Sequence, residues 1–538
     1  MSREAASAED LARPSYKWIW ERLFVRNLQG WSISLFPGGI GFSVFDYSPE
    51  KALRVCLSVE REDGATEPYL ADAYYVGEWG GGFQKWQTRP LPVFPYEGLH
   101  GLARAVTFSY SVLKDGLAIP SRFRYRFAAL EDFYRGRLAI DDFEDPAFRR
   151  ENDEPVAAAG DAAAQEAYDR MNARPDGFSL TPLFTRGNQG RPDHPVRAVH
   201  AAIDRVIEEA DRKRGARPSI LLAVFDFDNE HVTRHLVYAK EKGVEVECIG
   251  DWAQVSPMNA SENIARLRRA GIRVYGVIRN DPARPEDIVS MHTKFIVFGD
   301  DEVHSGSYNL HFHLWGGNWE GGLAYASADA AVIYRHIYHA IRFGLRVRLD
   351  VDPAARHNIY YSFGAYRADG SQLRPQDAII TEIENAGRSI VVCMFEIGPI
   401  RGAPNGRGPE TDVIGALIRA RDRGVRVRVI VNGMVSHTGP EPEPWDKDMP
   451  RPLKAPLNRL KDAWIEVYYV YYHESIHSPL HHKFAVFDEM CVIAGSYNWY
   501  EPSLYSDEIL TVTRDARIAS AFLDETELIL RSFRIRRG

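Results

Sequence analysis

Residues 292–309 read HTKFIVFGDDEVHSGSYN, and residues 481–498, far along the chain, read HHKFAVFDEMCVIAGSYN. In both stretches a histidine and a lysine two positions apart open an apolar run, and a Gly-Ser-Tyr-Asn segment closes it. The histidine and the glycine are 14 residues apart in each copy. One short motif is weak support for a shared role, but two copies in the same register indicate an internal duplication.

The segments before the two stretches are repeated as well. In each copy, helix-like segments alternate with three compact apolar segments that we predict to be strands: 219–225, 243–250 and 271–277 in the first copy, and 389–395, 424–431 and 464–470 in the second. Alternating helices and buried strands are typical of α/β proteins. We therefore predict an α/β fold with two related halves, residues 179–349 and 350–538.

The N-terminal part has a different texture. Residues 1–148 are rich in Trp, Tyr and Phe and contain short alternating runs separated by Gly and Pro, which predicts a β-rich, sandwich-like domain. Its aromatic residues fit either a core or a surface that contacts lipid or carbohydrate. Residues 149–178 include an Ala-rich stretch of low complexity and are predicted to be a linker.

The composition is that of an ordinary globular protein. The 538 residues are 45% apolar and 26% charged, and 66 Lys and Arg against 74 Asp and Glu give a net charge of −8. This balance provides no general attraction for polyanions and disfavours a protein dedicated to coating nucleic acid. The four cysteines lie in separate apolar runs and are expected to be buried free thiols.

The N-terminus, MSREAASAEDLARPSYKW, lacks the basic and apolar regions of a signal peptide. No window of about 18 apolar residues predicts a membrane span. We therefore expect a cytoplasmic, monomeric protein whose contact with a membrane is at most peripheral. Export by a route that reads no N-terminal signal stays open.

Each repeated stretch places a cation beside its histidine. Because residues two apart in an extended chain point to the same face, His292 shares a face with Lys294, and His481 shares a face with Lys483. Each copy therefore presents an imidazole together with an ammonium group.

The Gly-Ser-Tyr-Asn segments add neutral hydrogen-bonding groups. By the same alternation, Ser307 shares a face with Asn309, and Ser496 shares a face with Asn498. The glycine that precedes each pair allows close approach of the backbone.

Two such sets suit displacement at a phosphodiester. One imidazole attacks phosphorus, the other protonates the leaving oxygen, and the lysines and asparagines stabilise charge on the non-bridging oxygens. This chemistry requires no cofactor and no metal. Each histidine also needs an acceptor on its second ring nitrogen, and Glu320 and Glu508, 28 and 27 residues after the two histidines, are the candidates.

The paired H-x-K and G-S-x-N segments resemble the phospholipase D superfamily, whose signature is H-x-K-x4-D-x6-G-S-x-N. The second copy matches in full, with Asp488 at the aspartate position. The first copy departs from the signature, because Gly299 stands at that position and Asp300 follows one residue later. In this family the aspartate is chiefly a structural support, so the departure bears on local geometry more than on chemistry.

The resemblance implies that the two halves are αβα sandwiches, related by a pseudo-two-fold axis, that share one active site. It implies that His292 is the nucleophile, which forms a phosphohistidine, and that His481 is the general acid. It also implies that each histidine pairs with the carboxylate of the other half, His292 with Glu508 and His481 with Glu320.

The expected function is therefore that of a phospholipase D-type phosphodiesterase or phosphatidyltransferase acting on a phospholipid headgroup. Two alternatives stay open. A nuclease of the same superfamily would show a basic groove and salt-sensitive binding. An inactive binding or scaffold protein on the same fold would form no covalent intermediate.

Several further groups have both a functional and a structural interpretation. Asp226 and Glu396 end matching strands, and are either carboxylates near the site or solvated strand ends. Residues 438–457 form a Pro-rich segment that is either a lid or a passive surface loop. No closed tetrahedral ligand set has suitable spacing for zinc, so the other histidines near the motifs are expected to line the pocket: His311, His313, His473 and His477.

Overall fold

A computed structural model describes most of the chain from residue 159 onward and the N-terminal strands before it. The described residues are 31–36, 39–46, 52–60, 66–80, 83–88, 107–114, 117–120, 125–127, 140–141, 159–173, 178–185, 193–212, 217–255, 261–277, 279–281, 284–311, 318–343, 347–362, 364–366, 370, 373–400, 412–433, 435–436, 453–471, 480–504, 506–532 and 535–537. The chain divides into two compact units.

The first unit comprises Met1–Pro155, Asp251–Ser290 and Arg342–Gly344. Its N-terminal strands form one antiparallel sheet in the order β1-β2-β5-β4-β3-β6-β8-β9, with β7 paired to β6. Their bounds are β1 (Trp31–Phe36), β2 (Gly39–Asp46), β3 (Ala52–Glu60), β4 (Thr66–Gly80), β5 (Phe83–Thr88), β6 (Thr107–Lys114), β7 (Leu117–Pro120), β8 (Tyr125–Phe127) and β9 (Ile140–Asp141). The unit also contains α8 (Trp252–Val255), α9 (Glu262–Arg269), β14 (Arg273–Val277), β15 (Arg279–Asp281) and β16 (Arg284–Val289). The N-terminal region is therefore β-rich, as its alternating runs predict.

The second unit contains both copies of the repeated motif. In its first half the strand order is β10-β20-β18-β17-β11-β13. The bounds of these strands are β10 (Ser179–Phe184), β11 (Ser219–Val224), β13 (Glu245–Asp251), β17 (Lys294–Phe298), β18 (Glu302–Gly306) and β20 (Gly321–Ala326). The remaining elements of this half are α5 (Ala159–Ala173), α6 (Pro195–Arg212), α7 (Glu230–Glu241), α10 (Ala328–Phe343), β12 (Phe227–Asp228) and β19 (Leu310–His311).

The second half has an equivalent sheet in the order β22-β29-β28-β27-β24-β25-β26-β30. Its strands are β22 (His357–Tyr361), β24 (Ser389–Met394), β25 (Arg426–Asn432), β26 (Glu466–Val470), β27 (Lys483–Phe487), β28 (Cys491–Gly495), β29 (Ile509–Arg514) and β30 (Ile535–Arg537). Its other elements are β21 (Leu349–Asp350), β23 (Ala365–Tyr366), α11 (Pro375–Asn385), α12 (Val413–Asp422), α13 (Ala455–Asp462), α14 (Ala516–Ser532) and the 3-10 turn η4 (Glu501–Leu504).

The two sheets repeat one topology. In the first, β11 pairs in parallel with β13 and antiparallel with β17, and in the second, β24 pairs in parallel with β25 and antiparallel with β27. The motif strands β17 and β27 thus occupy matching central positions. This match confirms the internal duplication and the α/β class.

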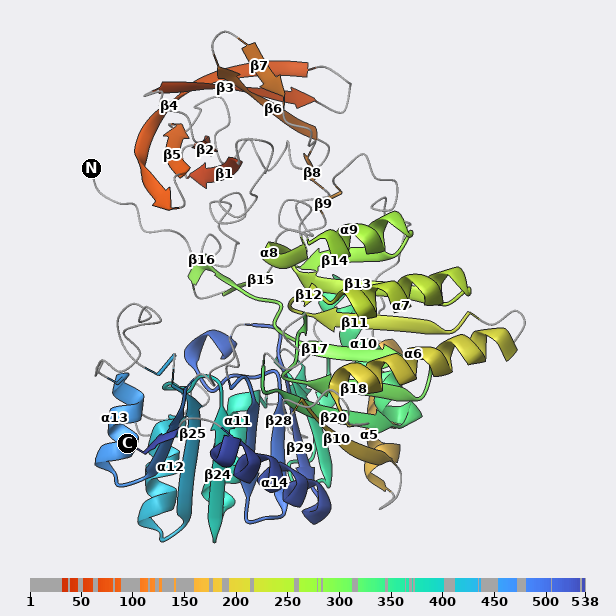
Figure 1. Ribbon diagram of the computed structural model, residues 1–538, viewed down its shortest axis with the longest axis vertical. Coiled ribbons are helices and arrows are strands. Elements are labelled where there is room, and N and C mark those ends of the chain that lie inside the picture. Colours follow the sequence, from red (N-terminus) through yellow and green to blue (C-terminus); the bar gives the residue numbers. More distant parts are fainter. Residues whose placement is uncertain are drawn as a thin grey trace. The chain divides into compact units, whose positions relative to one another are not determined.

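Helices cover both faces of the second-half sheet. Figure 1 shows α14 in front of these strands and α11 behind them. All side chains of β17 and β27 are buried. A strand that is covered on both faces has no solvent side, which explains why both motif strands are continuous apolar runs rather than alternating ones.

Part of the predicted linker is an ordered helix. Helix α5 begins at Ala159 and ends at Ala173, and the hydroxyl of Tyr168 donates a hydrogen bond of 2.6 Å to Asn358 Oδ1 in β22. Ala-rich sequence favours helix strongly enough for this segment to form one. The helix thus packs against the second half of the same unit.

Cysteines 248, 393 and 491 are buried and free, as predicted, and the side chain of Cys56 lies outside the described residues. Within the described residues, no helix has both the length and the apolar character needed to cross a bilayer.

Candidate active site

The two motif histidines lie immediately before matching strands, and each is tied to the opposite half by its backbone. The His292 amide donates to the carbonyl of Asp507, and the His481 amide donates to the carbonyl of Trp319, both at 2.9 Å. Short parallel bridges, Met291 with Asp507 and Trp319 with Leu480, surround these bonds. The halves therefore meet along the segments that carry the histidines.

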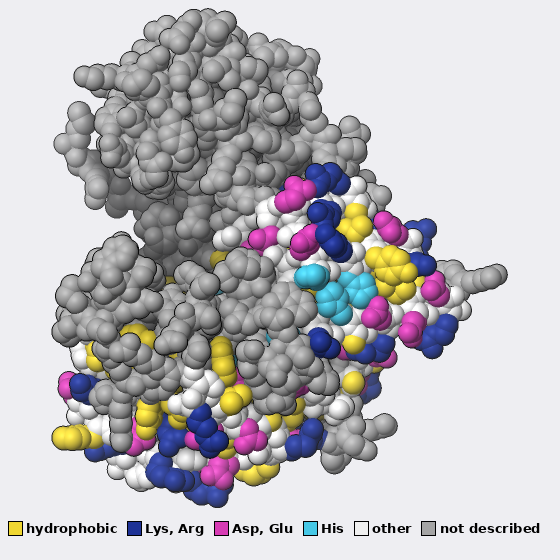
Figure 2. All heavy atoms as spheres, in the orientation of Figure 1, with side chains coloured by type: hydrophobic (Ala, Val, Ile, Leu, Met, Phe, Trp, Pro, Cys, Tyr) yellow, Lys and Arg dark blue, Asp and Glu magenta, His cyan; other side chains and the backbone are white. Residues whose placement is uncertain are grey.

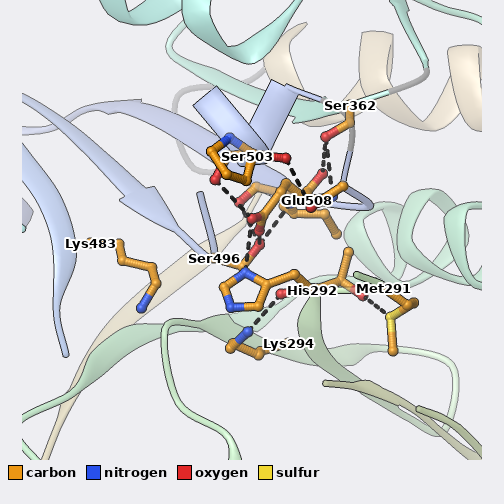
Figure 3. A network of polar contacts seen from close by, with 12 residues as sticks. Met291, His292, Lys294, Ser362, Lys483, Ser496, Ser503 and Glu508 are labelled. Atoms are coloured by element: carbon orange, nitrogen blue, oxygen red, sulfur yellow. Dashed lines mark hydrogen bonds and ion pairs between the residues drawn. The ribbon is translucent and has the colours of Figure 1, made fainter. Parts of the chain in front are cut away.

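Each histidine contacts the carboxylate of the other half. His292 Nδ1 lies 2.8 Å from Glu508 Oε1, and His481 Nδ1 lies 2.9 Å from Glu320 Oε2. Figure 3 shows the first pair. Each ring turns Nδ1 toward its carboxyl, so Nε2 is the nitrogen left for chemistry. Burial raises the pKa of Glu508 to about 8, whereas at Glu320 burial is opposed by the charge and hydrogen bond of His481, and the pKa is lowered to about 2. These contacts are the crossed pairs that the superfamily resemblance implies.

The motif serines fix the carboxylates. Ser496 donates its hydroxyl to Glu508 Oε2, and Ser307 donates to Glu320 Oε2 at 3.3 Å. Each serine oxygen also accepts a backbone amide of the following strand, at 3.0 Å from Ile509 and 3.1 Å from Gly321. The serines thus lie behind the carboxylates and support them.

A second pair of hydroxyls, which the motif analysis missed, holds the same carboxylate segments. The amide of Glu320 donates to Thr185 Oγ1 at 2.9 Å, and the amide of Glu508 donates to Ser362 Oγ at 3.1 Å. Both hydroxyl residues follow the edge strand of their half directly, β10 or β22. Aligning the repeats over their full length would have found these two positions.

The two carboxylates also have partners that are not matched between the halves. Asn318 Nδ2 donates to Glu320 Oε1 at 3.1 Å, whereas Ser503 Oγ donates to Glu508 Oε1 at 3.2 Å. Neither residue lies inside a motif, so the spacing of the motifs does not predict their contacts with the carboxylates.

The lysines lie close to the histidines. Lys294 Nζ donates to the carbonyl of His292 at 2.7 Å, and Lys483 Nζ donates to the carbonyl of His481 at 3.0 Å. Lys483 Nζ is also 3.2 Å from His481 Nε2. Figure 3 shows both lysine amino groups on the side of the His292 ring that faces away from Glu508. The space next to the Nε2 atoms is therefore lined by cations.

Burial changes the protonation of these groups. It lowers the pKa of Lys294 to about 7 and that of Lys483 to about 8, although the nearby carboxylates oppose the shift. Burial, reinforced by the lysines, also lowers the pKa of His292 well below its ordinary value. For His481, burial lowers the pKa to about 4 against the opposing effect of Glu320. Both imidazoles are therefore neutral near pH 7, which the attacking group requires.

The motif asparagines provide buried polar atoms. Asn309 and Asn498 are buried, and within the described part of the chain their Oδ1 atoms have no hydrogen-bond partner. An unpartnered buried polar atom is costly. The same acceptor atom has no partner at equivalent positions in both halves, and the Nδ2 group of each amide is the one that can donate to a phosphate oxygen.

The motif glycines are required by backbone packing. A Cβ at Gly306 would lie 2.5 Å from the carbonyl oxygen of Gly321, and one at Gly495 would lie 2.1 Å from that of Ile509. Only glycine permits this approach of neighbouring strands. The glycine therefore fixes the distance between each serine and its carboxylate.

The aspartate position differs between the halves. Asp488 accepts the backbone amides of Gly387, Arg388 and Ser389 at 2.7–2.9 Å, and thereby holds the chain that enters β24. Gly299 has the same left-handed backbone, with φ of 56° against 52° at Asp488. Asp300 does not take over this role, because its exposed carboxylate pairs instead with Arg335.

The remaining predicted residues have different environments. Burial raises the pKa of Asp226 against the opposing charges of His311 and Lys294, which places this carboxyl near the first-half lysine. Glu396 accepts a 2.6 Å hydrogen bond from Lys454, near the C-terminal end of the Pro-rich segment. His311 is buried, and its Nε2 lies 3.3 Å from Asn318 Nδ2. His313, His473, His477 and most of 438–457 lie outside the described residues.

Outside the site, histidines gather on the surface near α7 (Figure 2). His200 and His235 stack with ring centroids 4.9 Å apart, and His235 Nε2 lies 2.9 Å from Asp204 Oδ1. Within the described residues, including this cluster, no three or more His, Cys, Asp and Glu side chains are arranged to hold a metal ion.

Two duplicated halves that contribute a histidine, a lysine and a crossed carboxylate each to one centre define the phospholipase D superfamily. The profile of the family described as "Cardiolipin synthase, PLD-like domain" matches residues 212–342 and 379–529, one segment in each half. The chain belongs to this family.

Individual relatives are distant. The chain is 22% identical over 151 residues to the mitochondrial cardiolipin hydrolase of Chlamydomonas reinhardtii. The match covers 28% of this chain and 55% of that protein, so the chain spans about half the length of this curated relative. A solved phosphatidylserine synthase from Haemophilus influenzae is 11% identical with a TM-score of 0.44, covering 69% of this chain and 92% of that one. Nuc from Salmonella typhimurium, a phospholipase D family member, is 19% identical with a TM-score of 0.24, covering 34% of this chain and 98% of its own.

Proposed function

We propose that this protein cleaves the phosphodiester bond of a phospholipid headgroup in two steps, with His292 as the nucleophile and His481 as the general acid and base. The observation that carries the proposal is the pair of crossed contacts, His292 with Glu508 and His481 with Glu320. They turn one Nε2 atom from each half away from its carboxyl and toward two buried lysines, with Lys483 Nζ 3.2 Å from His481 Nε2. Displacement at phosphorus needs two such groups on opposite sides of one phosphate.

In the first step, His292 Nε2 attacks phosphorus and the bond to the headgroup oxygen breaks. That oxygen takes the proton from His481 Nε2 and leaves as an alcohol. In the second step, His481 removes a proton from water, the water oxygen attacks phosphorus, and the bond between nitrogen and phosphorus breaks. Phosphatidic acid is released and both histidines return to their starting state. An alcohol in place of water yields a new phosphodiester by the same step.

The buried charges support this sequence. Charge accumulates on the non-bridging oxygens in each step, and Lys294 and Lys483 are placed to stabilise it, together with the amides of Asn309 and Asn498. His481 is neutral at rest because burial lowers its pKa, but an anionic phosphodiester beside it favours the imidazolium. Lys483, 3.2 Å from His481 Nε2, is a proton donor already in contact.

The substrate class comes from the relatives. The matching family is described as "Cardiolipin synthase, PLD-like domain", and the curated relative is named a cardiolipin hydrolase; both names refer to a phospholipid, as product or as substrate. The net charge of −8 also favours a substrate other than a long polyanion.

The experiment measures headgroup release from mixed phospholipid vesicles in EDTA, with and without a primary alcohol. Wild type is compared with His292→Ala, His481→Ala and the matched surface control His200→Ala. Turnover in wild type and His200→Ala that is lost in the two site variants supports the proposal, and an alcohol-exchanged lipid identifies a covalent intermediate. Intact lipid, with cleavage of single- or double-stranded nucleic acid in a parallel assay, would instead assign a nuclease.

A further inference from the structure

A second histidine, His482, is next to the proposed general acid in the sequence and forms a buried polar pair with Glu525. His482 follows His481 in the chain, is 1% exposed, and has its Nε2 3.1 Å from Glu525 Oε1 of α14. Glu525 is itself fully buried. The His482 ring packs edge-on against Phe484, two residues along, with ring centroids 5.2 Å apart. His482 therefore faces away from His481 and Lys483, toward the helix layer.

The fold does not require this pair. Thr293 occupies the matching position in the first half, fully buried, and its hydroxyl contacts only the sulfur of Met291 among the contacts described, at 3.0 Å. Burying an imidazole and a carboxylate costs far more desolvation energy than burying a hydroxyl. The two halves match closely around their histidines, so the buried pair is a specific difference in the surroundings of His481.

His482 also contacts the segment that holds the carboxylate partner of His481. A Cβ at Gly321 would lie 3.0 Å from His482 Cε1, so the ring packs directly against the backbone that follows Glu320. On its other side, the carbonyl of His482 accepts the amide of Phe395 at 2.8 Å, and the Phe395 ring packs edge-on against His481. The carbonyl link is shared with the first half, where Thr293 accepts the amide of Phe225. The contact specific to the His482 ring is therefore the one with the backbone that follows Glu320.

We propose that His482 and Glu525 form a positioning pair for the general acid, which holds His481 and Glu320 in the relative placement that directs His481 Nε2 at the leaving oxygen. This inference rests on the proposed function and deepens it. The pair does not touch substrate. Its effect is specific to proton donation, because the first-half nucleophile has no such pair behind it.

The test compares two phosphatidyl substrates that differ only in the leaving group. Phosphatidylethanolamine releases an alkoxide that needs a proton, whereas phosphatidyl-p-nitrophenol releases a phenolate that needs almost none. In Glu525→Gln we expect the single-turnover rate of ethanolamine release to fall about 10- to 100-fold, and the burst of p-nitrophenol to change less than about threefold. Thr293→Val is the matched control, for which we expect the ratio of the two rates to stay at the wild-type value.

An equal loss with both substrates would show a merely structural role and overturn the inference, as would unchanged rates with both. If Glu525→Gln fails to give a wild-type thermal unfolding curve, His482→Gln provides the same comparison with an amide that still reaches Glu525.

A second readout does not depend on turnover. The proton between His481 Nδ1 and Glu320 is expected to give a downfield proton NMR signal that is lost in His481→Ala and shifts in Glu525→Gln. If wild type cleaves neither substrate, the proposed function fails, and this signal decides the positioning role alone. A signal unmoved by Glu525→Gln would overturn it.

Discussion

Glu508 follows His292 by 216 residues in the sequence, yet its Oε1 lies 2.8 Å from the Nδ1 of that histidine. The equivalent contact joins Glu320 to His481 across 161 residues in the opposite direction. The acid and base groups of each half are thus completed by the other half.

Neutralising either carboxylate should reduce activity through the histidine it contacts. Glu320→Gln removes the charge that stabilises cationic His481. Glu508→Gln removes the carboxyl that can take up the Nδ1 proton of His292 as that ring becomes cationic. We expect kcat to fall by ~10²–10⁴-fold in each. Glu320→Gln should spare a p-nitrophenyl substrate in the burst phase, whereas Glu508→Gln should not. Burst kinetics with both substrates measure the difference. Glu384→Gln, which alters an exposed ion pair with Arg419, is the control and should retain wild-type rates.

The covalent intermediate should accumulate when its hydrolysis is blocked. His481→Ala cannot activate water, so phosphatidyl-p-nitrophenol should give one equivalent of p-nitrophenol and leave the phosphatidyl group on the protein. Peptide mapping by mass spectrometry should locate it on His292. His292→Ala should trap nothing. Label on His481 in that variant would exchange the two proposed roles.

The dependence of kcat/KM on pH should reflect the buried lysines. A lysine is charged below its pKa, and burial lowers these values to about 7 for Lys294 and about 8 for Lys483. The charges that stabilise the phosphate are therefore lost as pH rises through 7 to 8, and activity should fall there. On the acid side, His292 stays neutral below its ordinary value of 6.5 because its pKa is lowered.

Lys483→Arg tests whether deprotonation of a lysine causes the fall in kcat/KM at high pH, since a guanidinium group keeps its charge across this range. The activity that remains in Lys483→Arg should therefore decline less near pH 8 than the activity of wild type. A wild-type profile that stays flat up to pH 10 would contradict the role of both lysines.

Asp488 should stabilise the fold in a pH-dependent manner. Burial tends to raise its pKa, but three backbone amides outweigh this effect and lower it, so its stabilisation is present above the unfolded-state pKa and is lost as pH falls through the lower folded-state value. Asp488→Asn should cost about 1–2 kcal/mol at pH 7 and little at pH 2. Urea unfolding at both pH values measures this. The exposed Asp300→Asn should change stability by less than about 0.5 kcal/mol at either pH.

The duplication made much of the fold predictable. Strands such as β11 and β24 are short and covered on both faces, and their burial is visible in the sequence as a continuous apolar run. The histidines, lysines and asparagines were predictable because alternation in an extended chain brings them to one face. The crossing of the carboxylates was implied only by resemblance, because sequence spacing alone does not reveal which half a side chain reaches.

Other features left no local pattern. Thr185 and Ser362 act through hydroxyls directly after edge strands, where a threonine or serine is unremarkable, and Glu525 is one of several polar residues in its helix. The failure of Asp300 to replace Asp488 follows from geometry, since a shift of one residue turns the side chain to the opposite side. The roles of His313, His473 and His477 stay predictions.

The crossed contacts also determine when, during its production, the molecule gains its chemistry. A ribosome that has translated the first half has made His292 and Glu320, but the partner of neither. Truncated translation products and proteolytic fragments that carry a single half therefore hold an uncompensated imidazole or carboxylate and no working pair. Lipid cleavage of the kind proposed would thus be withheld from membranes near the site of synthesis until both halves of one chain have been made and have closed on each other.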